Sequence, residues 1–195
     1  MGKIVCLMGK SSTGKDTIFK ELLEDGTIGC ETIVPYTTRP IRGGEENGVE
    51  YFFTDEENFQ RLKASGKVIE DRAYDTVYGL WRYFTVDDGQ IQLEQKSYLV
   101  IGTLEALHKL CEYFGKSNVL PVLVEVDDGV RLQRALERER RQPQPKYEEM
   151  CRRFLADSKD FSEENIAAAG DVARFRNDNL KECIEQIRAY IRDNI

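Results

Sequence analysis

Short apolar runs of strand length alternate along this chain with segments whose apolar residues recur at a helical period. The runs and the helical segments that follow them are 4–8 with 17–24, 98–102 with 103–114, and 119–126 with 130–141. A last short strand at 171–175 precedes a helix at 180–191, whose apolar face comprises positions 180, 183, 184, 187 and 191. This alternation predicts an α/β domain in which helices flank a central parallel β-sheet.

Two stretches interrupt the pattern. Residues 30–95 are rich in aromatic residues, short β-like runs and turn signals such as Asn47-Gly48, which predicts a small, mostly-β insert. In the segment Arg140 to Lys146, Pro143 and Pro145 separate two strongly charged helical segments, which is typical of a helical lid. We therefore predict one domain over 1–195, with a core of 1–33, 97–130 and 160–195, an insert at about 34–95 and a lid at about 131–156.

Composition limits the class of protein. The chain has 195 residues, of which 41% are hydrophobic and 32% charged, and a net charge of −7, which fits a soluble globular domain. This charge argues against a nucleic-acid or anionic-membrane partner, and no apolar run approaches the roughly 18 to 20 residues of a membrane span. A small anionic ligand held by a local arginine cluster stays compatible with it. The sequence leaves a monomer and a homodimer equally open.

The cysteines and the single histidine restrict the chemistry further. The five cysteines lie far apart, without the spacing of a zinc site, so we expect reduced thiols. The first apolar run is too short for a signal peptide, and we expect a cytoplasmic protein. His108 is the only histidine and falls in a helical pattern, so we interpret it as an ordinary helix residue rather than part of a triad or metal site.

A glycine-rich segment follows the first strand and opens the first helix. Its residues are Gly9, Lys10, Ser11, Ser12, Thr13, Gly14, Lys15, Asp16 and Thr17. Glycines let backbone N–H groups turn inward around phosphate oxygens, the helix N-terminus adds partial positive charge, and Lys15 can reach the β- and γ-phosphates. The segment predicts a phosphate-binding loop (P-loop) for a nucleoside triphosphate.

The metal-binding position of this loop departs from the usual pattern. The Ser or Thr that offers its hydroxyl to Mg²⁺ is Asp16 here, and a hydroxyl follows one position later at Thr17. Asp16 and Thr17 are thus the candidate metal ligands. An alternative is that Asp16 is only a first-turn acid that suits the helix dipole.

A proline-stiffened segment from Val34 to Arg42 places two arginines, Arg39 and Arg42, three positions apart. Arginine binds phosphate bidentately, so the pair suits an acceptor phosphate, although two solvated surface arginines would look the same. Around this segment the chain resembles the guanylate kinases. The motifs that carry the resemblance are Thr37-Thr38-Arg39-x-x-Arg42, Gly48-x-x-Tyr51-Phe52-Phe53, Glu70 after Gly66, Tyr78-Gly79, the arginine-rich lid and Arg176-Asn177-Asp178.

The resemblance covers essentially the whole chain and implies a P-loop kinase fold with a nucleoside-monophosphate-binding insert and a helical lid. It implies transfer of the γ-phosphoryl group of ATP to GMP with Mg²⁺. The GMP-binding residues would be Arg39, Arg42, Tyr51, Glu70, Tyr78 and Gly79, and Asn177 would contact the adenine of ATP. The catalytic residues would be Lys15, Arg39, Arg134, Arg138 and Arg153. For the last three, a salt-bridged solvated helix face is the alternative.

Glu70 has a physical case as the residue that recognises the base. Guanine presents a ring N–H and an amino group side by side, and an ionised carboxylate is a pure two-oxygen acceptor. Adenine would place a lone pair against one of the two oxygens. The resemblance therefore implies guanine rather than adenine at Glu70.

Three positions depart from the family's pattern. Pro35 stands where the family has a serine, Leu80 where it has Ser or Thr after Tyr78-Gly79, and Gly102 where an aspartate ends the strand. These departures favour, as one alternative, a related kinase acting on another nucleoside monophosphate, a deoxynucleotide or a ribose bisphosphate. A second alternative is a non-catalytic guanylate-kinase-like binding module. We also hypothesise that Asp16 partly replaces the acid lost at Gly102.

Overall fold

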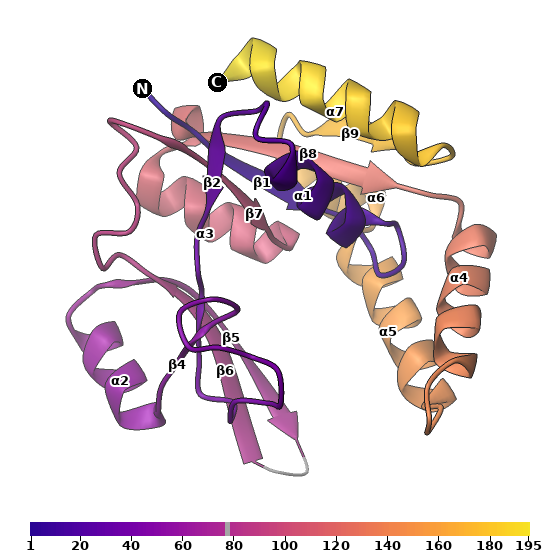
Figure 1. Cartoon of the computed structure of the whole chain (residues 1–195), viewed down its shortest axis with the longest axis horizontal. Helices are drawn as coiled ribbons and strands as arrows, with labels where there is room; N and C mark the ends of the chain where they lie inside the picture. Colours follow the sequence, from indigo (N-terminus) through magenta and orange to yellow (C-terminus); the bar gives the residue numbers. More distant parts are fainter. Residues whose placement is uncertain (77–78) are drawn as a thin grey trace.

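A five-stranded parallel sheet forms the centre of the molecule, in the strand order β2-β7-β1-β8-β9. The computed structural model describes residues 1–76 and 79–195, with Thr76 described by its backbone alone. The strands are β1 (Ile4–Met8), β2 (Cys30–Thr32), β7 (Ser97–Ile101), β8 (Val119–Glu125) and β9 (Ala173–Arg176), drawn in Figure 1. The predicted α/β fold with a central parallel sheet is confirmed, and the last strand begins two residues later than predicted because its pairing with β8 starts only at Ala173.

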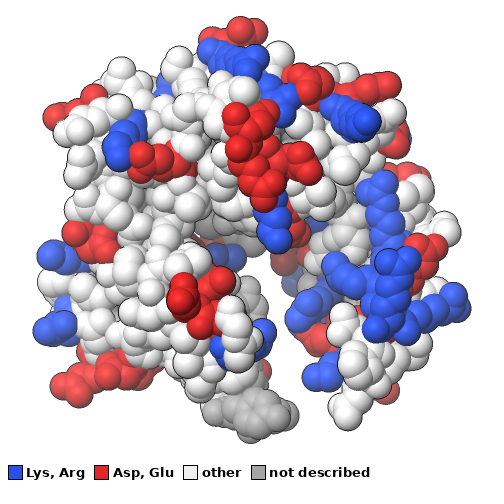
Figure 2. All heavy atoms as spheres, in the orientation of Figure 1, with Lys and Arg blue, Asp and Glu red and all other residues white. Residues whose placement is uncertain are grey.

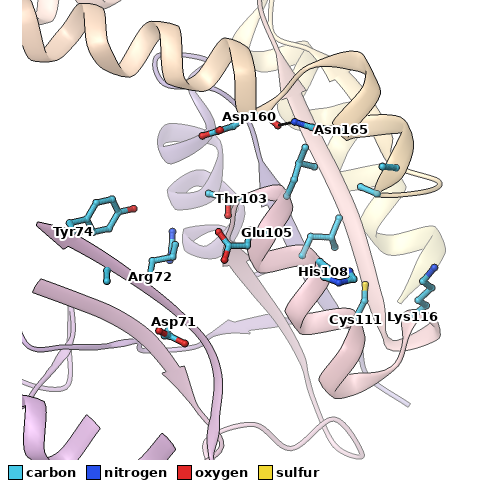
Figure 3. A pocket seen from close by; sticks show the side chains of 15 residues that line it. Asp71, Arg72, Tyr74, Thr103, Glu105, His108, Cys111, Lys116, Asp160 and Asn165 are labelled. Carbon is cyan, nitrogen blue, oxygen red and sulfur yellow. Dashed lines mark hydrogen bonds between the residues drawn. The ribbon is translucent and has the colours of Figure 1, made fainter. Parts of the chain in front are cut away.

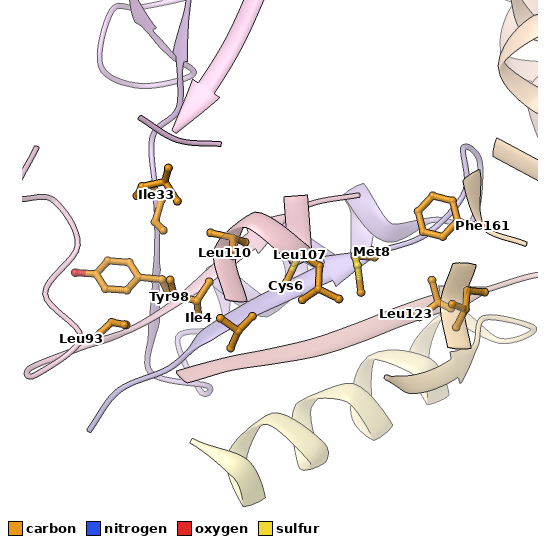
Figure 4. Close-up of a cluster of buried hydrophobic side chains, with 13 residues drawn as sticks. Ile4, Cys6, Met8, Ile33, Leu93, Tyr98, Leu107, Leu110, Leu123 and Phe161 are labelled. Atoms are coloured by element: carbon orange, nitrogen blue, oxygen red, sulfur yellow. The ribbon is translucent and has the colours of Figure 1, made fainter. Parts of the chain in front are cut away.

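Alternate residues of β1 point into two hydrophobic clusters, one on each face of the sheet. Ile4, Cys6 and Met8 pack against α3 (Leu104–Phe114) and α6 (Glu163–Ala168), and part of this cluster is drawn in Figure 4. Val5 and Leu7 pack against α1 (Lys15–Glu24) and α7 (Leu180–Asn194). Because β1 is fully buried on both faces, its position and that of the loop that follows it are fixed by the core.

The insert forms a separate four-stranded sheet, in the order β4-β3-β6-β5. Its elements are β3 (Tyr36–Thr37), β4 (Phe52–Phe53), α2 (Glu56–Ala64), β5 (Val68–Thr76) and β6 (Gly79–Val86). Within this mostly-β insert, α2 is a short polar helix whose only buried residue is Phe59. Phe59 packs on Phe84 and Val86, so α2 covers one face of the sheet and leaves the other face toward the core.

The charged segment forms a helical hairpin. It consists of α4 (Asp128–Arg140) and α5 (Tyr147–Asp160), which pack against each other and are joined by the proline-containing turn. Figure 1 shows this hairpin and the four-stranded sheet projecting from the same side of the core. The space-filling view in Figure 2 shows an open cleft between these two lobes.

Two negative findings concern the part of the chain that the structure describes. No helix there is both long and apolar enough to cross a membrane. All five cysteines are free thiols, as the sequence predicts.

Candidate active site

The loop between β1 and α1 has a backbone conformation that requires glycine at positions 9 and 14. Gly14 starts α1 with a φ of 89°, and a Cβ there would lie 2.5 Å from Nδ2 of Asn177. A Cβ at Gly9 would lie 2.6 Å from the carbonyl oxygen of Val124. No side chain caps the start of α1, so its first N–H groups are left for another acceptor. The loop therefore has the backbone of an anion-binding site.

Lys15, Asp16 and Thr17 lie together in the first turn of α1. Nζ of Lys15 is 3.3 Å from Oδ2 of Asp16, and the Asp16 side chain is 73% exposed. Carboxylate and hydroxyl oxygens are ligands that Mg²⁺ accepts, and Mg²⁺ commonly takes one or two protein oxygens together with substrate phosphates. The described residues contain no cluster of three or more His, Cys, Asp or Glu side chains suited to a metal. The donor set thus fits a metal held mainly by a bound nucleotide.

Asn177 is 2% exposed and supports the loop from the end of β9. Its Nδ2 donates to the carbonyl oxygen of Thr13 at 2.8 Å, and its backbone N–H donates to the carbonyl oxygen of Glu125 at 2.8 Å. Its Oδ1 is buried and has no hydrogen-bond partner among the described residues. The contact with adenine implied by the resemblance stays a prediction, while the structure places Asn177 against the phosphate loop.

The open face of the four-stranded sheet brings several predicted acceptor residues together. The guanidinium of Arg39 lies 5.5 Å from the ring centroid of Tyr51, and that ring is 5.6 Å from the ring of Tyr83. Tyr83 is paired with Arg72 of β5, and Glu70 lies two residues before Arg72 on the same face. The sequence analysis missed Arg72 and Tyr83. The two-residue period of β5, which places Glu70, Arg72 and Tyr74 in one row, is the signal that could have found Arg72.

Arg39 is only 3% exposed and is held by a carboxylate of its own loop. Its two terminal nitrogens donate to the two oxygens of Glu45 at 3.0 and 2.8 Å. These hydrogen bonds raise the pKa of Arg39 above its ordinary value and lower that of Glu45 below its own. The guanidinium thus already presents a fork to a pair of anionic oxygens, which is the geometry in which arginine binds phosphate.

Glu70 is 5% exposed and has one oxygen engaged and one not. The hydroxyl of Thr85 donates to Oε1 at 2.9 Å. Oε2 lies 3.3 Å from Nε of Arg72, an ion pair in which neither atom makes a hydrogen bond of good geometry within the described part of the chain. A buried carboxylate oxygen in this state is an acceptor available to a ligand.

The remaining acceptor residues are less constrained. Arg42 has an exposed side chain, and its backbone N–H donates to Oε2 of Glu45 at 2.7 Å. Gly79 is exposed at the start of β6. Tyr78 lies outside the described residues. Their roles at an acceptor phosphate stay predictions.

Gly102 has a structural explanation that the sequence did not supply. A Cβ at this position would lie 2.6 Å from Sγ of Cys6, so the thiol fills the space that an aspartate would need. Burial raises the pKa of Cys6 to about 12, which keeps the thiol neutral. Leu80, in place of a hydroxyl residue, is 46% exposed. The carbonyl of Pro35 accepts from the backbone N–H of Phe52 at 2.9 Å, so Pro35 contributes to the pairing of β3 with β4.

The predicted lid arginines lie on the helical hairpin with different surroundings. Arg134 is half-buried and Arg138 is exposed. Nε of Arg153 donates to Glu149 at 2.8 Å, and Arg152 binds the same carboxylate at 2.7 Å. The two hydrogen-bonded arginines lower the pKa of Glu149 to about 2. In this conformation Arg153 is therefore paired within α5 rather than directed to the phosphate loop.

Another arginine of the hairpin, Arg131, was not singled out from the sequence. It is 1% exposed and contacts both the phosphate loop and α5. Its position at the start of a charged helix gave no signal of burial, because two of its three hydrogen-bond partners among the described residues lie 120 and 26 positions away in the chain.

A pocket of about 790 Å³ opens between β5 and the start of α3 and extends to the end of α5 and to α6. Figure 3 shows Arg72 and Tyr74 on β5 opposite Thr103 and Glu105 on the α3 side. His108 also lines the pocket, on the exposed face of α3, with Nε2 3.2 Å from Glu112. The side chains of the insert and the core thus enclose a volume suited to a small polar ligand.

Comparison with known proteins gives consistent matches. The family model for guanylate kinase matches residues 1–84. The guanylate kinase of Porphyromonas gingivalis is 28% identical over 98% of this chain and 97% of that protein. That of Symbiobacterium thermophilum is 42% identical, over 40% of this chain and 37% of that protein. The crystal structure of guanylate kinase from Anaplasma phagocytophilum superposes with a TM-score of 0.67 at 20% identity, covering 98% of this chain and 85% of that one.

Proposed function

We propose that this chain, which is similar to guanylate kinases over nearly its whole length, transfers the γ-phosphoryl group of ATP to GMP, giving ADP and GDP. The observation that carries the proposal is the pairing of two anion-binding regions on one cleft. One is the phosphate loop with Lys15, and the other is the sheet face with Arg39 and Tyr51. A phosphotransferase with a phosphate acceptor needs both regions.

On the donor side, the loop N–H groups and Lys15 would bind the β- and γ-phosphates of ATP. Asp16 and Thr17 would hold Mg²⁺ together with these phosphates, and the metal supplies charge neutralisation of the transferring group when it is bound. The ammonium of Lys15 is held at α1 by Asp16 at 3.3 Å, so it needs little reorganisation to meet the phosphate.

On the acceptor side, Arg39 would exchange Glu45 for the phosphate of GMP without changing its own orientation, because both partners present two anionic oxygens. The exposed Arg42 would close on the same phosphate. An acceptor phosphate is already an anionic nucleophile, with a second pKa near about 6, so no strong general base is required.

The base would be recognised by a row of polar atoms on β5. Glu70 offers acceptor oxygens and Arg72, beside it at 3.3 Å, offers N–H donors. The Watson–Crick edge of guanine presents two adjacent donors followed by the O6 acceptor, which matches that row. Arg72 would in this way donate to O6 of guanine, which the apolar side chain of Leu80 cannot do.

Catalysis would then consist of positioning and charge compensation. Arg134, Arg138 and Arg153 would approach the equatorial oxygens of the transferring group when the α4–α5 hairpin moves toward the sheet. Arg153 would have to leave Glu149 to do so. Closure of the hairpin would also exclude water, which competes as an acceptor.

A second candidate is a related kinase for another phosphorylated acceptor. It is favoured by Cys6 occupying the space beside Gly102 and by Leu80, both in the acceptor region. The donor side, the phosphate-compensating arginines and the reaction class would be unchanged.

A steady-state screen with ATP and Mg²⁺ tests these proposals. The acceptors are GMP, dGMP, AMP, UMP and ribose 1,5-bisphosphate, and the readout is ADP formation. We expect the highest kcat/KM with GMP. A higher value with ribose 1,5-bisphosphate or AMP would establish the second candidate, and absence of measurable ATP binding would identify a non-catalytic module.

A further inference from the structure

The backbone of Ser11, within the phosphate loop, is hydrogen-bonded at both its N–H and its carbonyl by side chains of the helical hairpin. Its N–H donates to Oδ2 of Asp157 at 2.7 Å, and its carbonyl oxygen accepts from Nε of Arg131 at 3.0 Å. Arg131 closes the ring, because its NH2 nitrogen lies 3.3 Å from the same oxygen of Asp157. Two side chains, one from α4 and one from α5, thus hold the backbone of a single loop residue through its two adjacent peptide groups.

Arg131 is buried and fully engaged. Besides Ser11 and Asp157, its NH1 donates to Asp128, and its guanidinium stacks 4.8 Å from the ring of Phe154. Burial alone would raise the pKa of Asp128, but its hydrogen bond with Arg131 and the charge of Lys10 lower it overall. A buried guanidinium with a partner on each of its three nitrogens holds its neighbours in a defined geometry.

The location of Asp157 makes this arrangement more than structural. A carboxylate bonded to an N–H of the phosphate loop is a negative charge at a site that must accept the negative charges of ATP. Arg131 is the cation that compensates it, since the guanidinium and the carboxylate share a 3.3 Å contact in a partly buried setting. Without Arg131, Asp157 would repel the incoming phosphates.

We propose that Arg131 is a positioning residue for ATP: with Asp157 it clamps the backbone of Ser11, and it neutralises Asp157 so that the phosphate loop accepts the triphosphate. The clamp also joins the base of α4 to the loop. Arg134 lies one turn further along α4, so it is carried on a helix whose start is tied to the loop. Closure of the hairpin over the cleft would therefore have to bend α4 beyond Arg131. The inference rests on the proposed function in that ATP is the donor.

Binding of a non-hydrolysable ATP analogue with Mg²⁺, followed by calorimetry, tests the clamp without an acceptor. Arg131→Met should raise the dissociation constant of the analogue by about tenfold or more, as expected for one lost charge-assisted interaction. Arg131→Met combined with Asp157→Asn should recover most of the affinity, because the repelling charge is removed with its partner. Arg140→Met, which removes an exposed arginine from the same helix, is the matched control and should bind as the native chain does.

A purely structural role would lower the melting temperature of Arg131→Met but would not let the double variant regain ATP affinity. The proposal is therefore overturned if Arg131→Met binds the analogue within about twofold of the native chain, or if the double variant binds no better than Arg131→Met. If Arg131→Met does not fold, Arg131→Gln compared with the charge-retaining Arg131→Lys makes the same test, with the lysine variant expected to bind more tightly.

Failure of the clamp and failure of the proposed function give different results. If the native chain binds the analogue but phosphorylates no acceptor in the screen, the proposed function fails and the binding comparison still decides the role of Arg131. If the native chain phosphorylates GMP and Arg131→Met binds the analogue equally well, only the clamp fails.

Discussion

The two sides of the cleft, which we propose bind the phosphate donor and the acceptor, each contain a buried arginine held by carboxylates, and the two differ in where those carboxylates come from. Arg131 is bound by Asp128 of its own helix, by Asp157 of α5 and by the carbonyl of Ser11, which is 120 positions away. Arg39 is bound by Glu45, six positions away, and by the carbonyl of its neighbour Pro40.

The origin of these partners indicates which of the two arginines can exchange a partner for a ligand. Displacing a partner of Arg131 would disturb the loop and both lid helices, so Arg131 suits a fixed, positioning role. Glu45 sits in a short loop and can be replaced by a ligand anion without moving the two sheets, so Arg39 suits an exchangeable, phosphate-binding role. Variants of these residues and of their neighbours in the cleft separate the two roles.

The largest effect is expected at Lys15. Lys15→Met should lower kcat by a factor on the order of 10³, because a cation at the transferring phosphoryl group is lost. Unfolding should be little changed, since Asp16 on the exposed helix surface is its ion-pair partner. Steady-state ADP release with ATP and GMP measures the effect, and Lys20→Met, an exposed position on the same helix, is the control. If Lys15→Met keeps most of the activity, the loop lysine does not take part in phosphoryl transfer.

A smaller effect is expected from the exposed member of the arginine pair. Arg42→Met should raise the KM for GMP by about tenfold while leaving the KM for ATP and the melting temperature unchanged, because one charge-assisted contact is lost at an exposed site. Arg39→Met should raise the same KM and also lower the melting temperature, since it leaves Glu45 without its cation. Equal thermal stability of the two variants would contradict the conclusion that the buried ion pair of Arg39 with Glu45 stabilises the fold.

The base-recognition row can be separated from phosphate binding. Arg72→Met should reduce kcat/KM for GMP by about tenfold but leave that for the 2-aminopurine nucleotide, which lacks the O6 carbonyl, nearly unchanged. Arg61→Met on α2, an exposed arginine of the same lobe, serves as the control. A uniform loss with both acceptors would assign Arg72 to folding of the insert instead.

The smallest effect concerns pH. Hydrogen bonds from Arg39 lower the pKa of Glu45 from its ordinary 4.5, so the ionised carboxylate stabilises the fold above that value. This contribution is lost as pH falls through the lower, folded-state pKa. Trp81, the only tryptophan, lies in β6 and reports on the insert. The melting temperature followed by its fluorescence should fall less steeply with decreasing pH in Glu45→Gln than in the native chain. If the two plots of melting temperature against pH are parallel, the Arg39–Glu45 ion pair does not contribute to the acid sensitivity.

Local patterns were sufficient to predict much of the fold. The apolar runs of β1, β7 and β8 and the periodic faces of α3 and α7 identified the core, because burial on both faces of a parallel sheet leaves a continuous apolar run. The packing of helix α2 could not be predicted in this way, because it depends on Phe59 contacting a sheet contributed by other segments.

The candidate site divides in the same way. The phosphate loop is visible in the sequence, because glycine spacing and the lysine that follows it act within a few residues. The roles of Arg72, Cys6 and Arg131 are not visible, because each depends on a side chain brought near by folding. Cys6 and Gly102 are an example: either residue alone is unremarkable in a sequence, and only their contact explains why no carboxylate ends β7.

The α/β class and the glycine-rich loop after β1 could be read from the sequence alone, since they follow from neighbouring residues and their backbone preferences. The same local patterns supplied the predicted acceptor role of the arginine and aromatic residues in the insert. The tertiary structure alone decided which arginines are clamped and by whom, which carboxylate oxygen is left for a ligand, and how the lid is tied to the loop. The physical reason is that burial and electrostatic pairing depend on distances in space, and those distances join residues as far apart in the chain as Ser11 and Asp157.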